Sequence, residues 1–224
     1  MGKRLSGVAV AGGLLLMTCI GTWGQSQPTF VGVRTFLGAP YVTNLEELKA
    51  DFAVLGVPFD EGTWGQPGER YGPRDLRESS QEYNHDLTEG FYYIDGDRTV
   101  LKGKRWADVG DVLIYPTVPA QTDDKITAAV KKILDKKAFP IILGGDHSIS
   151  FPVIRALDRD VTVVHFDAHL DTWNGEPGNL DHASWVNRAA QLPRVLAAAR
   201  SRGTRTRRSA IRRRATPRVR AAAG

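Results

Sequence analysis

A strand, a short helix and a second strand follow one another between residues 139 and 166, and this segment constrains the fold most strongly. Residues 139–143 form an apolar run that ends in two glycines, and residues 161–166 form a β-branched run. Such runs are typical of buried strands. We expect a helix over 150–157 between them. A unit of this length joins parallel strands, which we expect to be neighbours in one sheet. The sequence therefore predicts an α/β fold.

The residues before this unit extend the same alternation of strands and helices. Residues 52–57 are a short apolar run and predict another buried strand. Pro73 suits the first position of a helix, which we expect over 74–80. Thr122 is expected to be the N-cap of a further helix. The apolar face of that helix would consist of Ile126, Val130, Ile133 and Leu134.

Polar residues follow both strands of the first unit. One strand leads into Gly144-Gly145-Asp146-His147-Ser148, and the other leads into Asp167-Ala168-His169-Leu170-Asp171. Ligands of open α/β sheets bind beyond the carboxyl ends of the strands, and parallel neighbours bring both ends to one edge. Residues i, i+2 and i+4 of an extended segment point the same way. We therefore expect Asp167, His169 and Asp171 to converge beside His147.

Two carboxylates and an imidazole this close favour a cation among them. Mixed histidine and carboxylate ligation suits Mn²⁺, and Zn²⁺ and Fe²⁺ are compatible with the same donor types. The single cysteine, Cys19, excludes an intrachain disulfide and a cysteine-based zinc site. Each motif alone also fits surface polar residues or a tight turn. Because both follow successive strands, the sequence favours a metal site.

These motifs resemble those of the arginase/agmatinase (ureohydrolase) family, and of its agmatinases most closely. The two polar segments match the family's first and second metal motifs, and residues 55–60 and 67–74 are similar to agmatinase segments around the first helix. Asp181-His182-Ala183-Ser184 resembles the family's Asp-His-Gly-Ser/Thr stretch, with alanine in place of glycine. The similarity covers about residues 30–190, which would form a partial ureohydrolase domain.

The resemblance implies a fold, a reaction and a set of roles. The fold would be a three-layer αβα sandwich with a parallel central sheet, assembled as a trimer or hexamer. Agmatine would be hydrolysed to putrescine and urea; arginine and guanidinobutyrate are alternative substrates. Of two Mn²⁺, His147 and Asp171 would hold one and His169 the other, with Asp167 bridging them. His182 would transfer protons toward the departing amine, a common role of histidine side chains.

The sequence departs from the family pattern after residue 181. The family's third motif, Ser-x-Asp-x-Asp-x-x-Asp-Pro, supplies two further aspartate ligands, but this sequence has no Asp or Glu after Asp181. The sheet would also lack its last strands. We therefore expect the chain to be incomplete at the C-terminus, to bind two Mn²⁺ poorly, to fold marginally and to have little or no activity.

Positive charge is concentrated at the C-terminal end. The last 37 residues, from Arg188 on, carry 12 Arg and no Asp or Glu. The net charge of the whole chain is +5, so the residues before Arg188 are acidic overall. Residues 191–224 are rich in Arg and Ala and are expected to be disordered. They would be either a frameshift product or a phosphate-binding tail of a non-catalytic nucleic-acid-binding protein. The frameshift is favoured because lysine is absent and the change is abrupt, so nucleic acid is not an expected partner.

Residues 1–24 resemble an export signal. Lys3 and Arg4 precede residues 8–21, which are uncharged, mostly apolar and too short to span a bilayer comfortably. Three interpretations are open: plain secretion, lipidation at Cys19 with membrane anchoring, or a misassigned start codon before a cytoplasmic protein. Export is favoured, to the periplasm, the medium or a lipid anchor.

Overall fold

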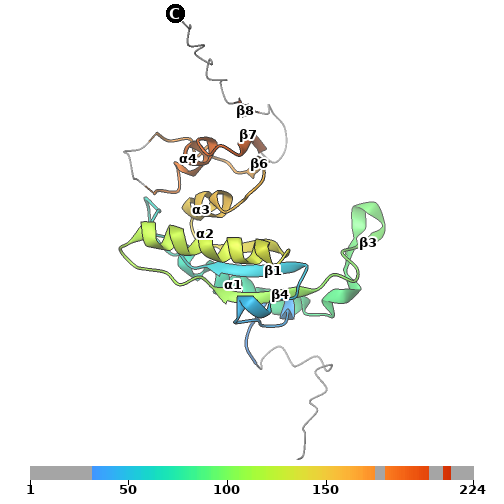
Figure 1. Ribbon diagram of the computed structural model, residues 1–224. Coiled ribbons are helices and arrows are strands. Elements are labelled where there is room, and N and C mark those ends of the chain that lie inside the picture. Colours follow the sequence, from blue (N-terminus) through green and yellow to red (C-terminus); the bar gives the residue numbers. More distant parts are fainter. Residues whose placement is uncertain (1–31, 175–179, 202–208, 213–224) are drawn as a thin grey trace, which may run out of the picture.

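The computed structural model describes residues 32–174, 180–201 and 209–212 and shows an α/β chain (Figure 1). The predicted export signal, residues 1–24 with Cys19, lies outside the described residues. Within the ranges described, no helix has the length and apolar character needed to cross a membrane.

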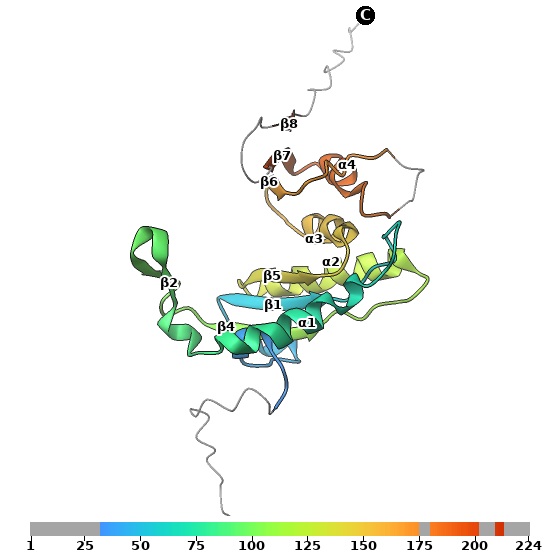
Figure 2. The same ribbon diagram turned by 180° about the vertical axis from the view of Figure 1, so that it is seen from behind.

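The first sheet forms the centre of the molecule. Its strands are all parallel, in the order β4-β1-β5. β1 is central and almost entirely buried, which confirms the strand predicted for this apolar run. The helices α1 and α2 lie on opposite faces of this sheet (Figures 1 and 2), so it is the middle of three layers. The bounds are β1 (Phe52–Val57), β4 (Trp106–Asp111), β5 (Phe139–Gly144), α1 (Gly72–Ser79) and α2 (Pro119–Asp135).

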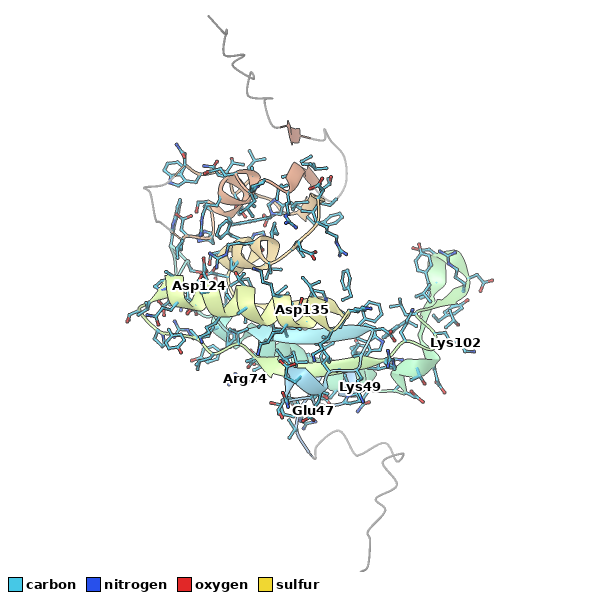
Figure 3. The ribbon with its side chains drawn as sticks, viewed as in Figure 1. Glu47, Lys49, Arg74, Lys102, Asp124 and Asp135 are labelled. Atoms are coloured by element: carbon cyan, nitrogen blue, oxygen red, sulfur yellow. The ribbon has the colours of Figure 1, made fainter. Side chains whose placement is uncertain are left out.

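Helix α2 supplies much of the main core. Ile126, Val130 and Ile133 are fully buried, as the predicted apolar face requires. The exposed carboxylates Asp124 and Asp135 mark the opposite face of the helix (Figure 3).

The predicted N-cap of α2 is wrong. The helix begins one turn earlier than expected, with Pro119 in its first turn, where proline loses no hydrogen bond. Thr122 is instead buried inside the helix, and its Oγ1 accepts a hydrogen bond of 3.0 Å from the Tyr115 N–H.

A buried ion pair joins α1 to the edge strand β4. The Arg77 guanidinium donates to both oxygens of Asp108, over 2.8 and 2.9 Å, and to Asp111 over 2.7 Å. Asp108 is fully buried and also accepts the backbone N–H of Phe36. Burial lowers the pKa of Arg77, but Asp108 and Asp111 outweigh it and raise that pKa overall. The guanidinium therefore stays charged, and the ion pair fixes how α1 packs on the sheet.

The second sheet lies beyond the first and follows the order β6-β7-β8 (Figure 1). β6 and β7 are parallel, and β8 runs antiparallel to β7. Trp185, Val186 and Ala189 of α4 pack with Ala198 of β7 in a small separate core. The bounds are β6 (Val161–Phe166), β7 (Val195–Ser201), β8 (Ser209–Arg212), α3 (Ser150–Arg155) and α4 (Trp185–Ala190).

Disorder was predicted for all of residues 191–224, and for two segments this is wrong. Residues 195–201 form β7 and residues 209–212 form β8. Val195 and Ala198 are buried, so small apolar residues between the arginines suffice to pair with β6 and cover α4. Residues 202–208 and 213–224 lie outside the described part of the chain.

β5 and β6 were expected to be neighbours in one sheet, and this expectation is also wrong. β5 pairs in parallel with β1, and β6 pairs in parallel with β7, so the two strands belong to different sheets. A cavity of about 440 Å³ lies between them, lined by Ile142 of β5, Val164 of β6 and Trp185 of α4, among others. No ladder of backbone hydrogen bonds joins the two strands. The α/β class and the parallel central sheet are confirmed; the single continuous sheet is not.

The remaining elements are short. A hairpin of β2 (Phe91–Tyr93) and β3 (Arg98–Val100) projects from one end of the molecule (Figure 2). In the described ranges, 3₁₀ helices cover Phe36–Gly38, Leu45–Glu47, Glu69–Tyr71, Ser80–Tyr83, Leu87–Glu89, Ile94–Gly96 and His147–Ile149.

Candidate metal centre and active site

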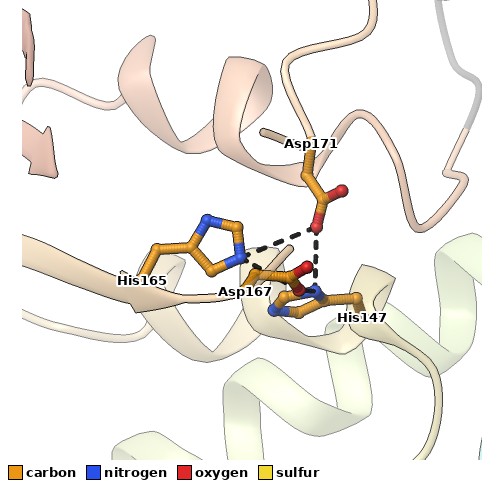
Figure 4. A group of neighbouring side chains, drawn as sticks. All are labelled: His147, His165, Asp167 and Asp171. Carbon is orange, nitrogen blue, oxygen red and sulfur yellow. Dashed lines mark ion pairs between the residues drawn. The ribbon is translucent and has the colours of Figure 1, made fainter. Parts of the chain in front are cut away.

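Four side chains meet at the carboxyl ends of β5 and β6: His165 belongs to β6 itself, and His147, Asp167 and Asp171 follow the strands (Figure 4). His147 Nδ1 lies 2.8 Å from Asp171 Oδ2 and 3.0 Å from Asp167 Oδ2. His165 Nε2 lies 3.3 Å from Asp167 Oδ2 and 3.8 Å from Asp171 Oδ2. The structure thus brings together three of the predicted ligands, His147, Asp167 and Asp171, and adds His165.

His169 does not join this group. The Asp167 Oδ1 accepts the backbone N–H of His169 over 2.7 Å, which bends the chain directly after β6. The His169 side chain is 84% exposed, and its Nδ1 lies 3.5 Å from Asp167 Oδ1. The prediction that Asp167, His169 and Asp171 converge assumed an extended segment, and the bend makes it wrong for His169.

Asp171 reaches the cluster through an unusual backbone conformation. Its φ is 49°, in the left-handed region that aspartate tolerates better than most residues. The Trp185 Nε1–H donates to Asp171 Oδ2 over 2.8 Å. The Trp185 ring also lies 4.8 Å from the His147 ring and 5.0 Å from the His165 ring, between centroids. Trp185 therefore orients one carboxylate and packs against both imidazoles.

His165 was missed by sequence reasoning because it lies inside the predicted strand. Only 6% of His165 is exposed. The two-residue period of a strand could have indicated His165, because His165 precedes Asp167 by two positions and therefore lies on the same face. A polar side chain near the end of β6, on the same face as Asp167, is therefore a candidate member of the site.

The protonation states suit metal ligation. Burial lowers the pKa of His147, and this outweighs the opposite effect of Asp171. Burial raises the pKa of Asp167, but the His169 N–H and the neighbouring imidazoles outweigh it, so this pKa is lowered overall. Near neutral pH the cluster therefore offers a neutral imidazole and a carboxylate, the forms that bind metals. The buried His165 Nε2 lies 3.3 Å from Asp167 Oδ2. Two imidazoles and two carboxylates whose ligand atoms all lie within 4.8 Å of one another are a donor set that fits a divalent cation.

His182 lines a cavity of about 450 Å³, and His147 of the cluster lines the same cavity. The His182 Nδ1 is 2.7 Å from the carbonyl oxygen of Gly62. A carbonyl only accepts hydrogen bonds, so Nδ1 carries the proton and Nε2 of the neutral ring is free to accept one. Trp64 packs edge-on against His182, with 5.3 Å between ring centroids. The structure places the predicted proton-transfer residue in the wall of a cavity next to the cluster.

The loop that supplies Trp64 and Glu69 to this cavity is fixed by Asp60. Asp60 is 2% exposed, and its carboxylate accepts hydrogen bonds from the Arg70 Nε and the Gly68 N–H, over 2.7 and 2.9 Å. The Arg70 guanidinium holds the pKa of Asp60 below its usual value.

Replacing Asp60 with asparagine is expected to destabilise the protein in a pH-dependent way. A carboxyl whose pKa is lowered by folding stabilises the fold above its unfolded pKa, near 3.8, and this contribution is lost as the pH falls through the folded value. Near neutral pH we expect a loss of about 1–3 kcal/mol in the free energy of unfolding, measured by urea denaturation. The difference should shrink in strong acid; an equal difference in acid would contradict this account.

Comparison with known proteins agrees with this geometry. Residues 50–219 match the model of the arginase family. The chain belongs to the arginase family. The match includes part of the segment predicted to be a frameshifted tail, and it bears out the resemblance seen in the motifs.

Individual relatives show which members of the family the chain is similar to. The chain is 35% identical to the agmatinase of Bacillus subtilis over 169 residues, covering 71% of this chain and 54% of that protein. It is 35% identical to the guanidinobutyrase of Pseudomonas aeruginosa over 153 residues, covering 66% and 46%. The chain spans about half the length of the curated relatives it matches.

Solved structures show the same fold. A hypothetical agmatinase from Burkholderia thailandensis is 29% identical, with a TM-score of 0.62 over 73% of this chain and 51% of that one. The proclavaminate amidino hydrolase of Streptomyces clavuligerus is 25% identical, with a TM-score of 0.67 over 78% and 58%. The described residues therefore form an arginase-like α/β fold.

Proposed function

We propose that this chain carries the active site of a metal-dependent hydrolase that cleaves a guanidino group to urea and an amine. The observation that carries the proposal is the cluster of His147, His165, Asp167 and Asp171 beside a cavity that His182 also lines. The relatives named agmatinase and guanidinobutyrase support the same chemistry.

The residues of the chain have distinct roles in this proposal. His147, Asp167 and Asp171 hold the cation, for which Mn²⁺ is the proposed ion. When bound, a divalent ion supplies Lewis-acid activation of water near neutral pH. His182 accepts a proton at Nε2 and passes it to the departing amine, with the Gly62 carbonyl holding its Nδ1–H.

Agmatine is the proposed substrate because the cavity suits a cationic tail. Glu69 and Trp64 line the cavity, and Trp173 packs against Trp64 with 6.0 Å between ring centroids. A carboxylate and exposed indole rings favour an ammonium group over a carboxylate. Guanidinobutyrate is the alternative, and the relative named guanidinobutyrase favours it.

Replacing Glu69 with glutamine tests the choice of substrate. Glu69 is exposed, so loss of its charge is expected to raise the KM for agmatine about fivefold, corresponding to about 1 kcal/mol. The KM for guanidinobutyrate should stay the same or fall. The matched control is Glu82→Gln, an exposed glutamate away from the cavity. Equal effects on both substrates would remove Glu69 from substrate selection.

Replacing His182 with asparagine tests proton transfer. The asparagine amide can still donate to the Gly62 carbonyl but cannot accept a proton near neutral pH. We expect kcat to fall by about 10²–10⁴-fold with little change in KM. The remaining rate should also lose the histidine-dependent limb of its pH profile. An unchanged pH profile would show that His182 only shapes the cavity.

Urea release from agmatine by the metal-loaded chain tests the function itself, with guanidinobutyrate and arginine as the competing substrates. Metal-dependent urea formation supports the proposal. Assembly as a trimer or hexamer and export remain predictions, which light scattering of the purified protein and N-terminal sequencing after cell fractionation test directly.

A further inference from the structure

We propose that Asp146 is a positioning residue for His182 and acts through the backbone of Gly62. The Asp146 Oδ2 accepts the Gly62 N–H over 2.8 Å, and the Gly62 carbonyl oxygen accepts the His182 Nδ1–H over 2.7 Å. The inference rests on the proposed function, in which His182 transfers a proton, and it adds a residue to which that mechanism gives no role.

Three segments that are far apart in the chain meet at this link. Residues 59–62 follow β1, Asp146 follows β5, and His182 precedes α4. Asp146 contacts the first segment twice, because its N–H donates to the Phe59 carbonyl oxygen over 2.8 Å and its carboxylate accepts the Gly62 N–H. The Gly62 carbonyl oxygen in turn accepts the backbone N–H of His182 over 3.0 Å as well as its Nδ1–H. The position of the imidazole therefore depends on Asp146.

The contact between Asp146 and Gly62 is buried and leaves little room for movement. Asp146 is 4% exposed, so its carboxylate is shielded from water. A methyl group on Gly62 would lie 2.9 Å from Asp146 Oδ2 and 2.8 Å from Ser148 Oγ, closer than ordinary van der Waals contact. The Gly62 N–H and carbonyl flank one Cα, so a carboxylate that holds the first restricts the second. Removing the carboxylate would leave this buried N–H without its acceptor.

A fixed Nδ1–H determines which nitrogen of His182 takes part in proton transfer. When Nδ1 carries the proton of the neutral ring, Nε2 is the atom that accepts one. A misplacement of about 1 Å in a reacting group can cost about 100-fold in rate. Asp146 therefore affects the catalytic step through the orientation of His182, whereas substrate affinity does not depend on this link.

Asp146 also makes a second contact, which supports the metal centre. Its Oδ1 accepts the Ser148 N–H over 2.7 Å and caps the 3₁₀ helix that begins at His147. Asp146→Ser separates the two contacts. Serine caps helices about as well as aspartate, but its side chain is shorter and has a single oxygen, so it cannot also reach Gly62. This variant preserves the support of His147 and removes the link to His182.

Steady-state kinetics at saturating metal compare Asp146→Ser with the unaltered chain. We expect kcat for agmatine to fall about 10–100-fold, with KM and Mn²⁺ affinity within about threefold of the unaltered values. The matched control is Asp86→Ser, which makes the same change at an exposed cap away from the cavity, where Asp86 accepts the Thr88 N–H. The control should leave kcat unchanged. An unchanged kcat in Asp146→Ser would overturn the proposal.

A double-mutant cycle with His182→Asn shows through which residue Asp146 acts. Residues that act through one another have non-additive effects. Once His182 is replaced, Asp146→Ser should therefore lower kcat no further. A second loss as large as the first would show that Asp146 acts independently of His182 and would overturn the proposal.

Nitrogen-15 NMR of the His182 ring tests the link without substrate. In the Zn²⁺-loaded chain we expect the Nδ1–H tautomer in the unaltered protein and a mixture of both tautomers in Asp146→Ser. The Nε2–H tautomer in the unaltered protein, or an identical spectrum in the variant, would overturn the proposal.

Gly62→Ala replaces Asp146→Ser in both measurements if the serine variant does not fold. Its methyl group displaces the same peptide by crowding alone, because the φ of Gly62 lies outside the left-handed region. The same loss of kcat and the same mixture of tautomers are expected. A chain that gives the expected NMR result but forms no urea would contradict the proposed function and leave the link between Asp146 and His182 standing.

Discussion

Replacing Asp171 with asparagine is expected to weaken metal binding by more than about 100-fold and to abolish metal-dependent urea release. Asp171 faces both imidazoles of the cluster, and asparagine removes its charge while keeping an oxygen for the Trp185 N–H. Loss of an outer-shell contact already costs about 10–100-fold in metal affinity, so loss of a direct ligand should cost more. Calorimetric titration with Mn²⁺ measures the change.

Two further variants are compared with Asp171→Asn by their affinity for the metal ion. Trp185→Phe removes the hydrogen bond to Asp171 and reduces the ring that packs against both imidazoles, and it should weaken metal binding by about 10–100-fold. Asp160→Asn changes an exposed carboxylate before β6 and should leave affinity and activity unchanged. If Asp171→Asn binds metal within about threefold of the unaltered chain, Asp171 is not a ligand.

Replacing Arg77 with leucine is expected to destabilise the fold by about 3–5 kcal/mol. The substitution leaves the Asp108 carboxylate buried and without its cation, while the Phe36 N–H still holds it in place. Marginal stability of the whole domain would turn this loss into unfolding at ordinary temperature. The free energy of unfolding from urea denaturation gives the magnitude, and an unchanged m-value confirms that the denatured state is comparable.

Arg105→Leu is the matched comparison. Arg105 pairs with Asp51 over 3.3 Å, but its side chain is 62% exposed, so loss of this solvent-screened pair should leave the free energy of unfolding almost unchanged. Equal destabilisation by the two variants would show that burial of Arg77 does not determine the energy of its ion pair.

The strands of the molecule could be predicted from the sequence more reliably than their assembly. The apolar runs 52–57 and 161–166 are strands with those bounds, because each run is bordered by residues that interrupt a strand. The separation of β5 and β6 into two sheets could not be predicted, because the connection between two strands does not fix which strands pair, and here a cavity lies between them. The strands at 195–201 and 209–212 were hidden by arginine-rich composition.

The candidate site shows the same division. The order of residues along the chain placed His147, Asp167 and Asp171 at one edge, and the structure brings them together. The roles of His165 and His169 could not be read in this way. Whether a residue after a strand continues its extended geometry depends on local hydrogen bonds, here between the Asp167 carboxylate and the His169 N–H. A sequence period describes regular backbone only, and the site begins where the strand ends.

Urea release from agmatine, measured as Mn²⁺ is titrated into the metal-free chain, tests the account most directly. We expect urea formation from agmatine that rises with metal occupancy, exceeds that from guanidinobutyrate and arginine, and vanishes in Asp171→Asn. A chain that binds its metal ion yet forms no urea from any of these three compounds would contradict the proposed hydrolase.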